Sequence, residues 1–194
     1  MKKIYFTIAV LFLLSACTVI RELVTFSKCE FRLKSVQEVK IAGINLNNKT
    51  SLKDFNFSDL ASITQAVIRG SVPMNFYVDV EAKNPNSQNA SIDKIEWIAL
   101  VDDKEIVNGS LDQRIIVPAN NGVTTIPLKF SIDLIKISNS STAKSLAELA
   151  LSVMNIGNHN SRLTIKIKPS ITVGSFMIDY PGYISVTKEF SSGN

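Results

Sequence analysis

Histidine and cysteine are scarce in this sequence, which has one histidine, His159, and two cysteines, Cys17 and Cys29. Zinc sites are built from several Cys, His and carboxylate ligands, so no zinc ligand set is recognisable here. The Gly-x-Ser-x-Gly motif of a nucleophilic serine is also lacking. The acidic residues around Asp102 lack the loop spacing that surrounds calcium with oxygen ligands. We therefore expect no metal, no cofactor and no enzymatic activity, and we expect His159 to be a surface loop residue.

A strong charge of one sign is lacking as well. The 21 Lys and Arg residues against 17 Asp and Glu residues give a formal net charge of +4, to which Lys2 and Lys3 contribute two. The other basic residues are scattered, and Lys166 and Lys168 alternate with apolar neighbours as on the solvated face of a strand. Proteins that bind nucleic acid cluster their basic residues on one face. The sequence therefore predicts no nucleic-acid partner.

The hydrophobic run at the amino terminus, Ile4–Leu14, is too short to cross a membrane, which takes about 20 apolar residues. It follows the positively charged Lys2 and Lys3 and precedes the small residues Ser15 and Ala16. A positive region, a short apolar region and small residues before a cleavage point are the three parts of an export signal. The sequence therefore predicts a protein that is exported rather than one that spans the membrane.

The segment Leu14-Ser15-Ala16-Cys17 resembles the bacterial lipobox. The resemblance implies a bacterial lipoprotein in which residues 1–16 are a removable signal peptide and Cys17 is the lipid-attachment residue. Two or three acyl chains would hold such a protein firmly on a membrane, whereas one chain anchors marginally. Thr18 stands where an Asp would retain the protein at the inner membrane, so the expected location is the cell envelope, at the outer membrane. Cys29 would then be the remaining thiol, and we expect it to be buried.

The rest of the chain is dominated by a period of two in its apolar residues, which is typical of half-buried antiparallel strands. We expect residues 17–29 to form the acylated N-terminus and a short stem, and 30–194 to form a single domain. The expected strands are 74–83, 92–101, 104–111, 126–134, 163–173 and 183–190. The apolar positions change parity across Ala42-Gly43, which predicts a β-bulge there.

Two segments change to helical spacing. Ser58 is the expected N-cap of the first, in which Leu60, Ile63 and Val67 share a face that ends at Gly70. The second has a wider apolar face and ends near residue 157; its members are Ala143, Leu146, Ala147, Ala150, Leu151 and Met154. Because apolar helix faces pack against something, we expect both helices to cover the open end or one face of the sheet.

Several short motifs follow one another in an order that resembles a known family. They are Asn84-Pro85-Asn86, Val107-Asn108-Gly109, Ile116-Val117-Pro118-Ala119 and Thr125-Ile126-Pro127-Leu128. Over about residues 70–136 they resemble the water-stress and hypersensitive-response (WHy) domain of type-2 late-embryogenesis-abundant (LEA) proteins. The resemblance implies a mainly β fold, an immunoglobulin- or fibronectin-III-like antiparallel β-sandwich, here with two accessory amphipathic helices. It also implies a non-catalytic role in stress response or in binding at the envelope.

Three functions follow as hypotheses. The first is a structural or stress-protective module that contacts an envelope protein or another surface. The second is a carrier or sensor of a hydrophobic ligand such as lipid, which needs an apolar cavity of at least ~300 Å³. The third is an enzyme, which would require His159 in a cleft beside a carboxylate. The candidate binding residues are Leu146, Leu149 and Val153 on the second helix, and Tyr180 and Tyr183 around the turn Pro181-Gly182.

Overall fold

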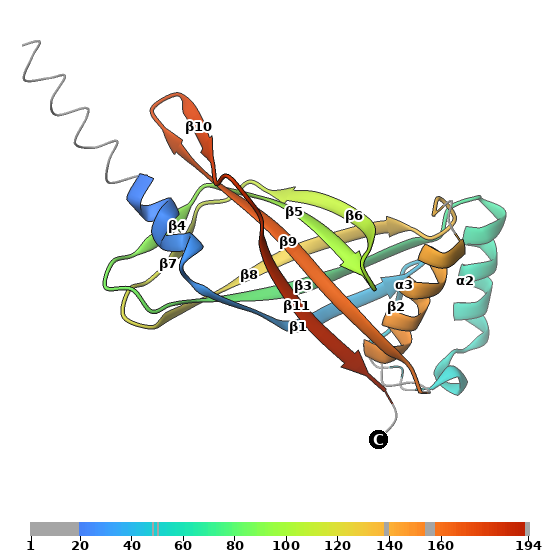
Figure 1. The fold of residues 1–194 in the computed structure, drawn as a ribbon. Helices are drawn as coiled ribbons and strands as arrows, with labels where there is room; N and C mark the ends of the chain where they lie inside the picture. The colour runs from blue at the N-terminus through green and yellow to red at the C-terminus, as the bar shows by residue number, and fades with distance from the viewer. Residues whose placement is uncertain (1–19, 48, 50, 138–139, 154–157, 193–194) are drawn as a thin grey trace, which may run out of the picture.

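Antiparallel strands make up most of the structure, a computed structural model that describes residues 20–47, 49, 51–137, 140–153 and 158–192 (Figure 1). Residues 20–27 are helical, and a 3₁₀ turn occupies Leu52–Asp54. The strands and longer helices are, in chain order, β1 Glu30–Ile41, β2 Ile44–Asn45, α2 Phe57–Ile68, β3 Pro73–Asn84, β4 Ala90–Ile92, β5 Lys94–Val101, β6 Lys104–Leu111, β7 Ile115–Val117, β8 Gly122–Asp133, α3 Ser140–Val153, β9 Asn160–Val173, β10 Phe176–Asp179 and β11 Ile184–Ser191.

Two antiparallel sheets enclose one core. The first has the order β2-β1-β3-β8, and the second has the order β10-β9-β5-β6, with β11 also paired to β9. The strands β4 and β7 form a separate short ladder. The sheets approach each other at their edges, where β1 lies beside β11 and the Lys188 ammonium donates to the Lys34 carbonyl at 3.1 Å. The prediction of a mainly β, antiparallel fold is therefore confirmed.

An aromatic stack joins the two sheets at the centre of the core. Phe130 of β8 stacks on Phe76 of β3 with ring centroids 4.6 Å apart, and on Trp97 of β5 at 4.3 Å. Gly109 of β6 faces Trp97 across the ladder, and a Cβ atom at this position would come within 2.4 Å of the indole ring. Glycine is therefore needed here because the indole occupies the space of a side chain.

The expected bulge at Ala42-Gly43 was wrong, because these two residues form the turn of the β1–β2 hairpin. Both have positive φ angles, 50° and 85°, and Ile41 pairs directly with Ile44. A two-residue turn with positive φ at both positions matches the twist of the paired strands. The irregularities of β1 lie earlier in the strand, and one of them contains Glu38 with a φ of 51°.

The helices have different relations to this core. The 20–27 helix inserts Leu23 and Phe26 into it, with exposures of 4% and 0%, so the expected stem is packed against the domain. Helix α3 lies against β9, β11, β5 and β6 at one end of the sheets, as expected for a covering helix. Helix α2 lies outside this end, at the far side of the molecule from the 20–27 helix (Figure 1).

Candidate functional site

The lipobox residues Leu14, Ser15, Ala16 and Cys17 lie outside the described residues. The first described segment is the 20–27 helix, which begins the part of the chain that follows them. None of the helices in the described ranges has the length and apolar character needed to cross a bilayer.

The candidate residues of α3 face the core. Leu146 and Leu149 are buried, with exposures of 1% and 4%, and Val153 is half-buried. Beside them is an apolar cavity of about 20 Å³, lined by Val36, Val39, Met74, Phe76, Leu149, Ala150, Val153 and Leu163. This volume is far below the ~300 Å³ expected of a ligand pocket. In the part of α3 that the structure describes, these side chains therefore serve packing.

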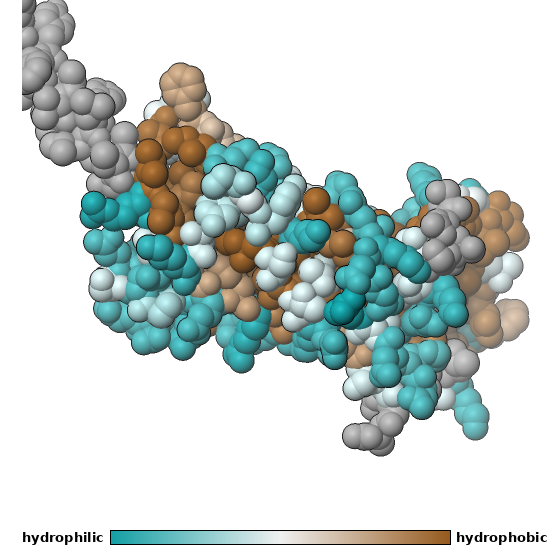
Figure 2. Space-filling model, viewed as in Figure 1, coloured by the Kyte–Doolittle hydropathy of each residue, from teal (hydrophilic) through white to brown (hydrophobic). Residues whose placement is uncertain are grey.

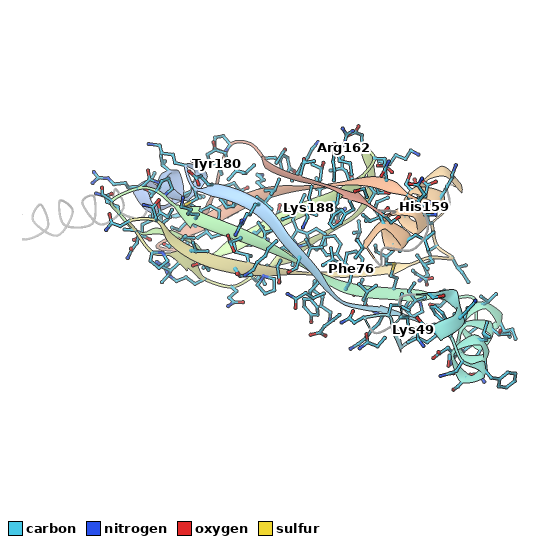
Figure 3. All side chains as sticks on the ribbon, turned by 90° about the horizontal axis from the view of Figure 1, so that it is seen from below. Lys49, Phe76, His159, Arg162, Tyr180 and Lys188 are labelled. Carbon is cyan, nitrogen blue, oxygen red and sulfur yellow. The ribbon has the colours of Figure 1, made fainter. Side chains whose placement is uncertain are left out.

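The segment Tyr180–Tyr183 is not the tip of a hairpin. It joins β10 to β11, which lie end to end along the same edge of β9. Tyr180 is half-buried and packs against the core at the end of the molecule that carries the 20–27 helix, whereas Tyr183 is 51% exposed (Figure 3). The hairpin tip next to them is the turn at Gly174, between β9 and β10.

His159 lies in the loop before β9, near α3 (Figure 3). Its backbone N–H donates to the Ser192 hydroxyl at 2.9 Å, and its carbonyl accepts from the Ser192 N–H at the same distance. Among the described residues, no group of three or more His, Cys, Asp or Glu side chains is placed to hold a metal ion. The contacts of His159 that the structure records thus join the start of β9 to the end of β11.

Cys29 is buried, as expected, at the junction between the 20–27 helix and β1. Its thiol lies 3.6 Å from the Thr25 carbonyl. Burial raises the pKa of the Cys29 thiol to about 11. Since the thiolate is the reactive form, this environment favours an inert structural cysteine.

The Asn84-Pro85-Asn86 triplet is an architectural element. The fully buried Asn84 amide donates to the carbonyls of Gln88 and Val117 at 2.8 and 3.1 Å, which ties the end of β3 to β7. Its side-chain oxygen accepts from the backbone and side-chain nitrogens of Asn86 at 3.0 and 2.9 Å. The side-chain nitrogen of Asn84 thus donates two hydrogen bonds and its side-chain oxygen accepts two, and all four hold the turn.

A polar network fastens the 20–27 helix to the sheets. Arg114 donates to Glu22 of the helix at 3.2 Å and to Asp93, before β5, at 2.8 Å. Asp93 in turn accepts from the backbone N–H of Thr172 at 2.8 Å, and Thr172 pairs with Met177 of β10. Buried Ser91 completes the network by donating to Glu22. The network places the exposed side of the helix and the β9–β10 hairpin at the same end of the molecule.

Large apolar side chains gather on that end. Figure 2 shows hydrophobic surface over the 20–27 helix and over the neighbouring β10 hairpin. The exposed members are Ile20 at 41%, Val24 at 42%, Phe176 at 77%, Met177 at 53% and Tyr183 at 51%. We call these five residues the apolar end. Contiguous exposed apolar surface of this kind marks interaction sites in soluble domains.

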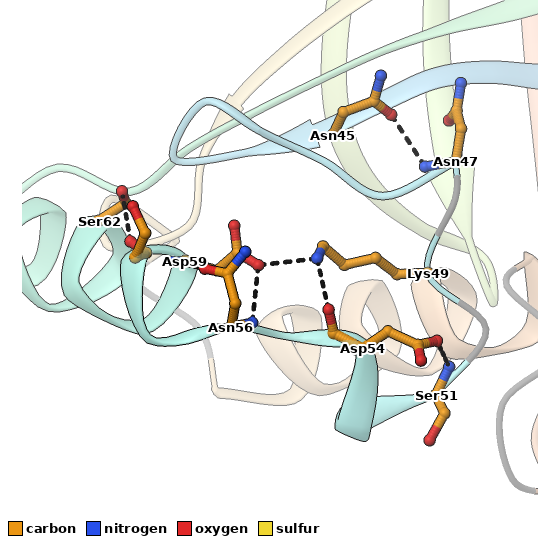
Figure 4. Close-up of polar contacts among 9 residues, drawn as sticks. Asn45, Asn47, Lys49, Ser51, Asp54, Asn56, Asp59 and Ser62 are labelled. Atoms are coloured by element: carbon orange, nitrogen blue, oxygen red, sulfur yellow. Dashed lines mark hydrogen bonds and ion pairs between the residues drawn. The ribbon is translucent and has the colours of Figure 1, made fainter.

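Helix α2 carries a second exposed apolar face. The expectation that Leu60, Ile63 and Val67 together cover the sheet was wrong for Leu60 and Val67, whereas Ile63 is half-buried against the core. Phe57, Leu60, Val67 and Ile68 are 54–88% exposed, whereas Ala66 is buried. The side that faces the protein is instead held by polar contacts: Lys49 pairs with Asp59 at 2.7 Å and donates to the Asp54 carbonyl at 2.7 Å (Figure 4). The polar contacts therefore decide which side of this amphipathic helix faces outward.

The N-cap of α2 is Asn56 and not the expected Ser58. The Asn56 side chain accepts from the Asp59 N–H at 2.9 Å, and the Asp59 carboxylate accepts from the Asn56 N–H at 3.0 Å, so the two residues form a capping box. The Lys49 ammonium and the Asn56 N–H lower the pKa of Asp59. Asp59 therefore serves both the cap and the attachment of α2, and Gly70 ends the helix as expected, with a φ of 72°.

No protein-family model and no curated protein sequence matches the chain. Similar solved structures include a protein from Archaeoglobus fulgidus, at 12% identity and a TM-score of 0.34, over 63% of this chain and 87% of that one. They also include a candidate LEA protein, at 13% identity and a TM-score of 0.37, over 99% and 84%. A third, from Arabidopsis thaliana, has 15% identity and a TM-score of 0.35, over 84% and 76%. TM-scores of this size do not place the chain in a family.

Proposed function

We propose that this protein is a lipid-anchored lipoprotein of the bacterial envelope whose β domain is a non-catalytic binding module, structural or stress-protective in role. The observation that carries the proposal is the sequence Leu14-Ser15-Ala16-Cys17 behind a short apolar run, which places an acylation site just before the folded domain. Acylation at Cys17 would make the membrane its first partner, and Thr18 favours the outer membrane. A second partner would be an envelope protein or lipid at the exposed apolar surfaces.

The contacts of the WHy-like motifs support a structural role for these residues. Asn84 holds a turn, and Gly109 makes room for Trp97. Gly122 is similarly packed, because a Cβ atom there would come within 2.4 Å of the Pro118 carbonyl oxygen. The motif order and these contacts together favour an LEA type-2-like domain, a variant of the immunoglobulin- or fibronectin-III-like sandwich. Because the motif residues have structural roles, we expect binding to use the exposed surface of the domain.

The lipid-carrier hypothesis receives less support. It required an apolar cavity of at least ~300 Å³ between the sheets and α3, and the apolar cavity beside Leu149 and Val153 is about 20 Å³. A larger hollow of about 440 Å³ lies between β6, β8 and the start of α3, but its lining includes the charged residues Glu105, Asp133 and Lys136. The enzyme hypothesis required a carboxylate partner for His159 in a cleft. The contacts of His159 are instead with Ser192. We therefore favour the binding module over both alternatives.

Replacement of the acylated cysteine tests the proposal. Cys17→Ala should abolish incorporation of labelled palmitate and leave the precursor unprocessed, because the sulfur that carries the lipid is lost. Cys29→Ala is the matched control and should be labelled as the unaltered protein is, since its thiol is buried. Labelling that persists in Cys17→Ala would contradict the proposal.

A further inference from the structure

The apolar end lies next to the point at which the proposed lipid would be attached. Cys17 is three residues before Ile20 in the sequence, and three residues of fully extended chain span at most about 11 Å. So short a connection holds this end of the domain close to any bilayer that contains the acyl chains. The five residues of the apolar end, Ile20, Val24, Phe176, Met177 and Tyr183, are thus exposed hydrophobic residues close to that bilayer.

We propose that the apolar end is a second membrane contact, which seats the domain end-on in the interfacial region of the anchoring bilayer with Phe176 and Met177 inserted. This inference rests on the proposed lipoprotein function. The occupant is a lipid surface because the anchor itself delivers this end to one. Aromatic side chains such as Tyr183 favour the level of the headgroups, where an apolar ring and a polar group are both accommodated.

The charges around the apolar end fit a lipid surface. Arg21 of the 20–27 helix and Lys28, directly after it, are both exposed, as are Ile20 and Val24. Cationic residues beside an apolar face are attracted to anionic lipid headgroups. Three nearby carboxylates are each paired with a cation of the protein itself: Glu22 and Asp93 pair with Arg114, and Asp179 pairs with Lys168 at 3.0 Å. Their repulsion of anionic headgroups is therefore reduced.

The β9–β10 hairpin is suited to presenting its tip. Phe176 pairs with Val173 and Met177 with Thr172, so the two exposed side chains are held by a backbone ladder that is continuous with the core strand β9. The network from Thr172 through Asp93 and Arg114 to Glu22 holds the hairpin in place relative to the helix. Insertion of the tip therefore requires no change in the fold.

Fluorescence quenching by brominated lipids tests the inference on the full lipidated chain. Phe176→Trp is made, with Met177→Trp as a second probe, and the protein is reconstituted in phosphatidylethanolamine–phosphatidylglycerol vesicles with brominated or plain acyl chains. Phe57→Trp, on the exposed face of α2 at 88% exposure, is the matched control. Trp97 is buried and contributes the same background to all variants.

The added emission of Phe176→Trp should fall about twofold or more in brominated vesicles, since a side chain among the acyl chains contacts bromine. The emission of Phe57→Trp should not change. The inference would be overturned if the emission of Phe176→Trp and of Met177→Trp were the same in brominated and in plain vesicles. It would also be overturned if Phe57→Trp on α2 were quenched as strongly as these two variants. Mass spectrometry of the mature N-terminus distinguishes the failure of the lipoprotein proposal from the failure of the membrane-contact inference. An acylated protein without quenching would contradict only the membrane contact, and a protein without acyl groups would contradict both.

Discussion

Asn84 shows how a single residue of the resembling motif can be essential without being a binding residue. Asn84→Ala would leave the carbonyls of Gln88 and Val117 without their donor in a buried position. An unsatisfied buried polar group costs about 1–3 kcal/mol, so we expect a loss of this size in the free energy of unfolding. Urea titration followed by Trp97 fluorescence measures it. Gln88→Ala, which keeps the backbone carbonyl and alters an exposed side chain, should stay within about 0.5 kcal/mol of the unaltered protein.

Cys29 is the residue whose chemistry depends most directly on burial. With the pKa of the thiol raised from 9.0 to about 11, the folded protein at pH 8 should react with iodoacetamide far more slowly than the unfolded protein. The raised pKa also means that the folded state retains this proton longer than the unfolded state. Its contribution to stability is therefore complete below pH 9 and is lost as the pH rises toward about 11. Alkylation of Cys29 at the same rate with and without urea would contradict its burial.

At the scale of the element, α2 and α3 are both amphipathic, but the large side chains Leu146 and Leu149 of α3 are buried, whereas Leu60 and Val67 of α2 are exposed. Leu146→Ala in α3 should lower the free energy of unfolding by about 2–5 kcal/mol, because it opens a cavity in the core. Leu60→Ala in α2 is the matched change on a side chain that is 56% exposed, and it should cost no more than about 0.5 kcal/mol. Chemical denaturation of both variants gives the comparison. Equal losses would mean that the α2 face is covered.

The strands and the helix α2 also show how much of the fold the sequence could predict. Strict alternation located β3, β8 and β9 to within a few residues, because one buried face imposes a period of two. Helical periodicity located α2 but not its orientation, since a pattern reports an apolar face and not what covers it. That orientation is set by Lys49 and Asp59, whose pairing across the chain has no signature in local spacing.

Short-range features that depend on tertiary packing were missed for a related reason. The 20–27 helix has too few turns for a periodic signal in the sequence. The sequence therefore predicted a stem for this segment, although Leu23 and Phe26 lie in the core. Glu38 adopts a positive φ that its residue type does not favour, and such a position cannot be read from composition. Of the candidate binding residues, Tyr183 is an exposed member of the apolar end, whereas Leu146 and Leu149 are packing residues.

At the scale of the whole molecule, the two exposed apolar faces lie at opposite ends of an elongated body (Figures 1 and 2). The apolar end lies beside the proposed anchor, and α2 lies at the far end. If the domain stands end-on, α2 is held away from the bilayer by the length of β3 and β8. A 12-residue strand extends about 40 Å at roughly 3.3 Å per residue. The two faces therefore cannot serve the same membrane in this orientation.

This arrangement requires that the 20–27 helix belongs to the domain and is not a flexible leader. Phe26 is fully buried, and the centroid of its ring lies 5.2 Å from the centroid of the Phe31 ring. Phe26→Ala should therefore lower the free energy of unfolding of the whole domain by about 3–5 kcal/mol. The unfolding curves from Trp97 fluorescence and far-ultraviolet circular dichroism should shift together, as in a two-state transition. Val24→Ala, on the exposed side of the same helix, should change stability by no more than about 0.5 kcal/mol. If Phe26→Ala left the Trp97 transition unchanged, the helix would be a separate stem, and the domain would be free to tilt on its anchor.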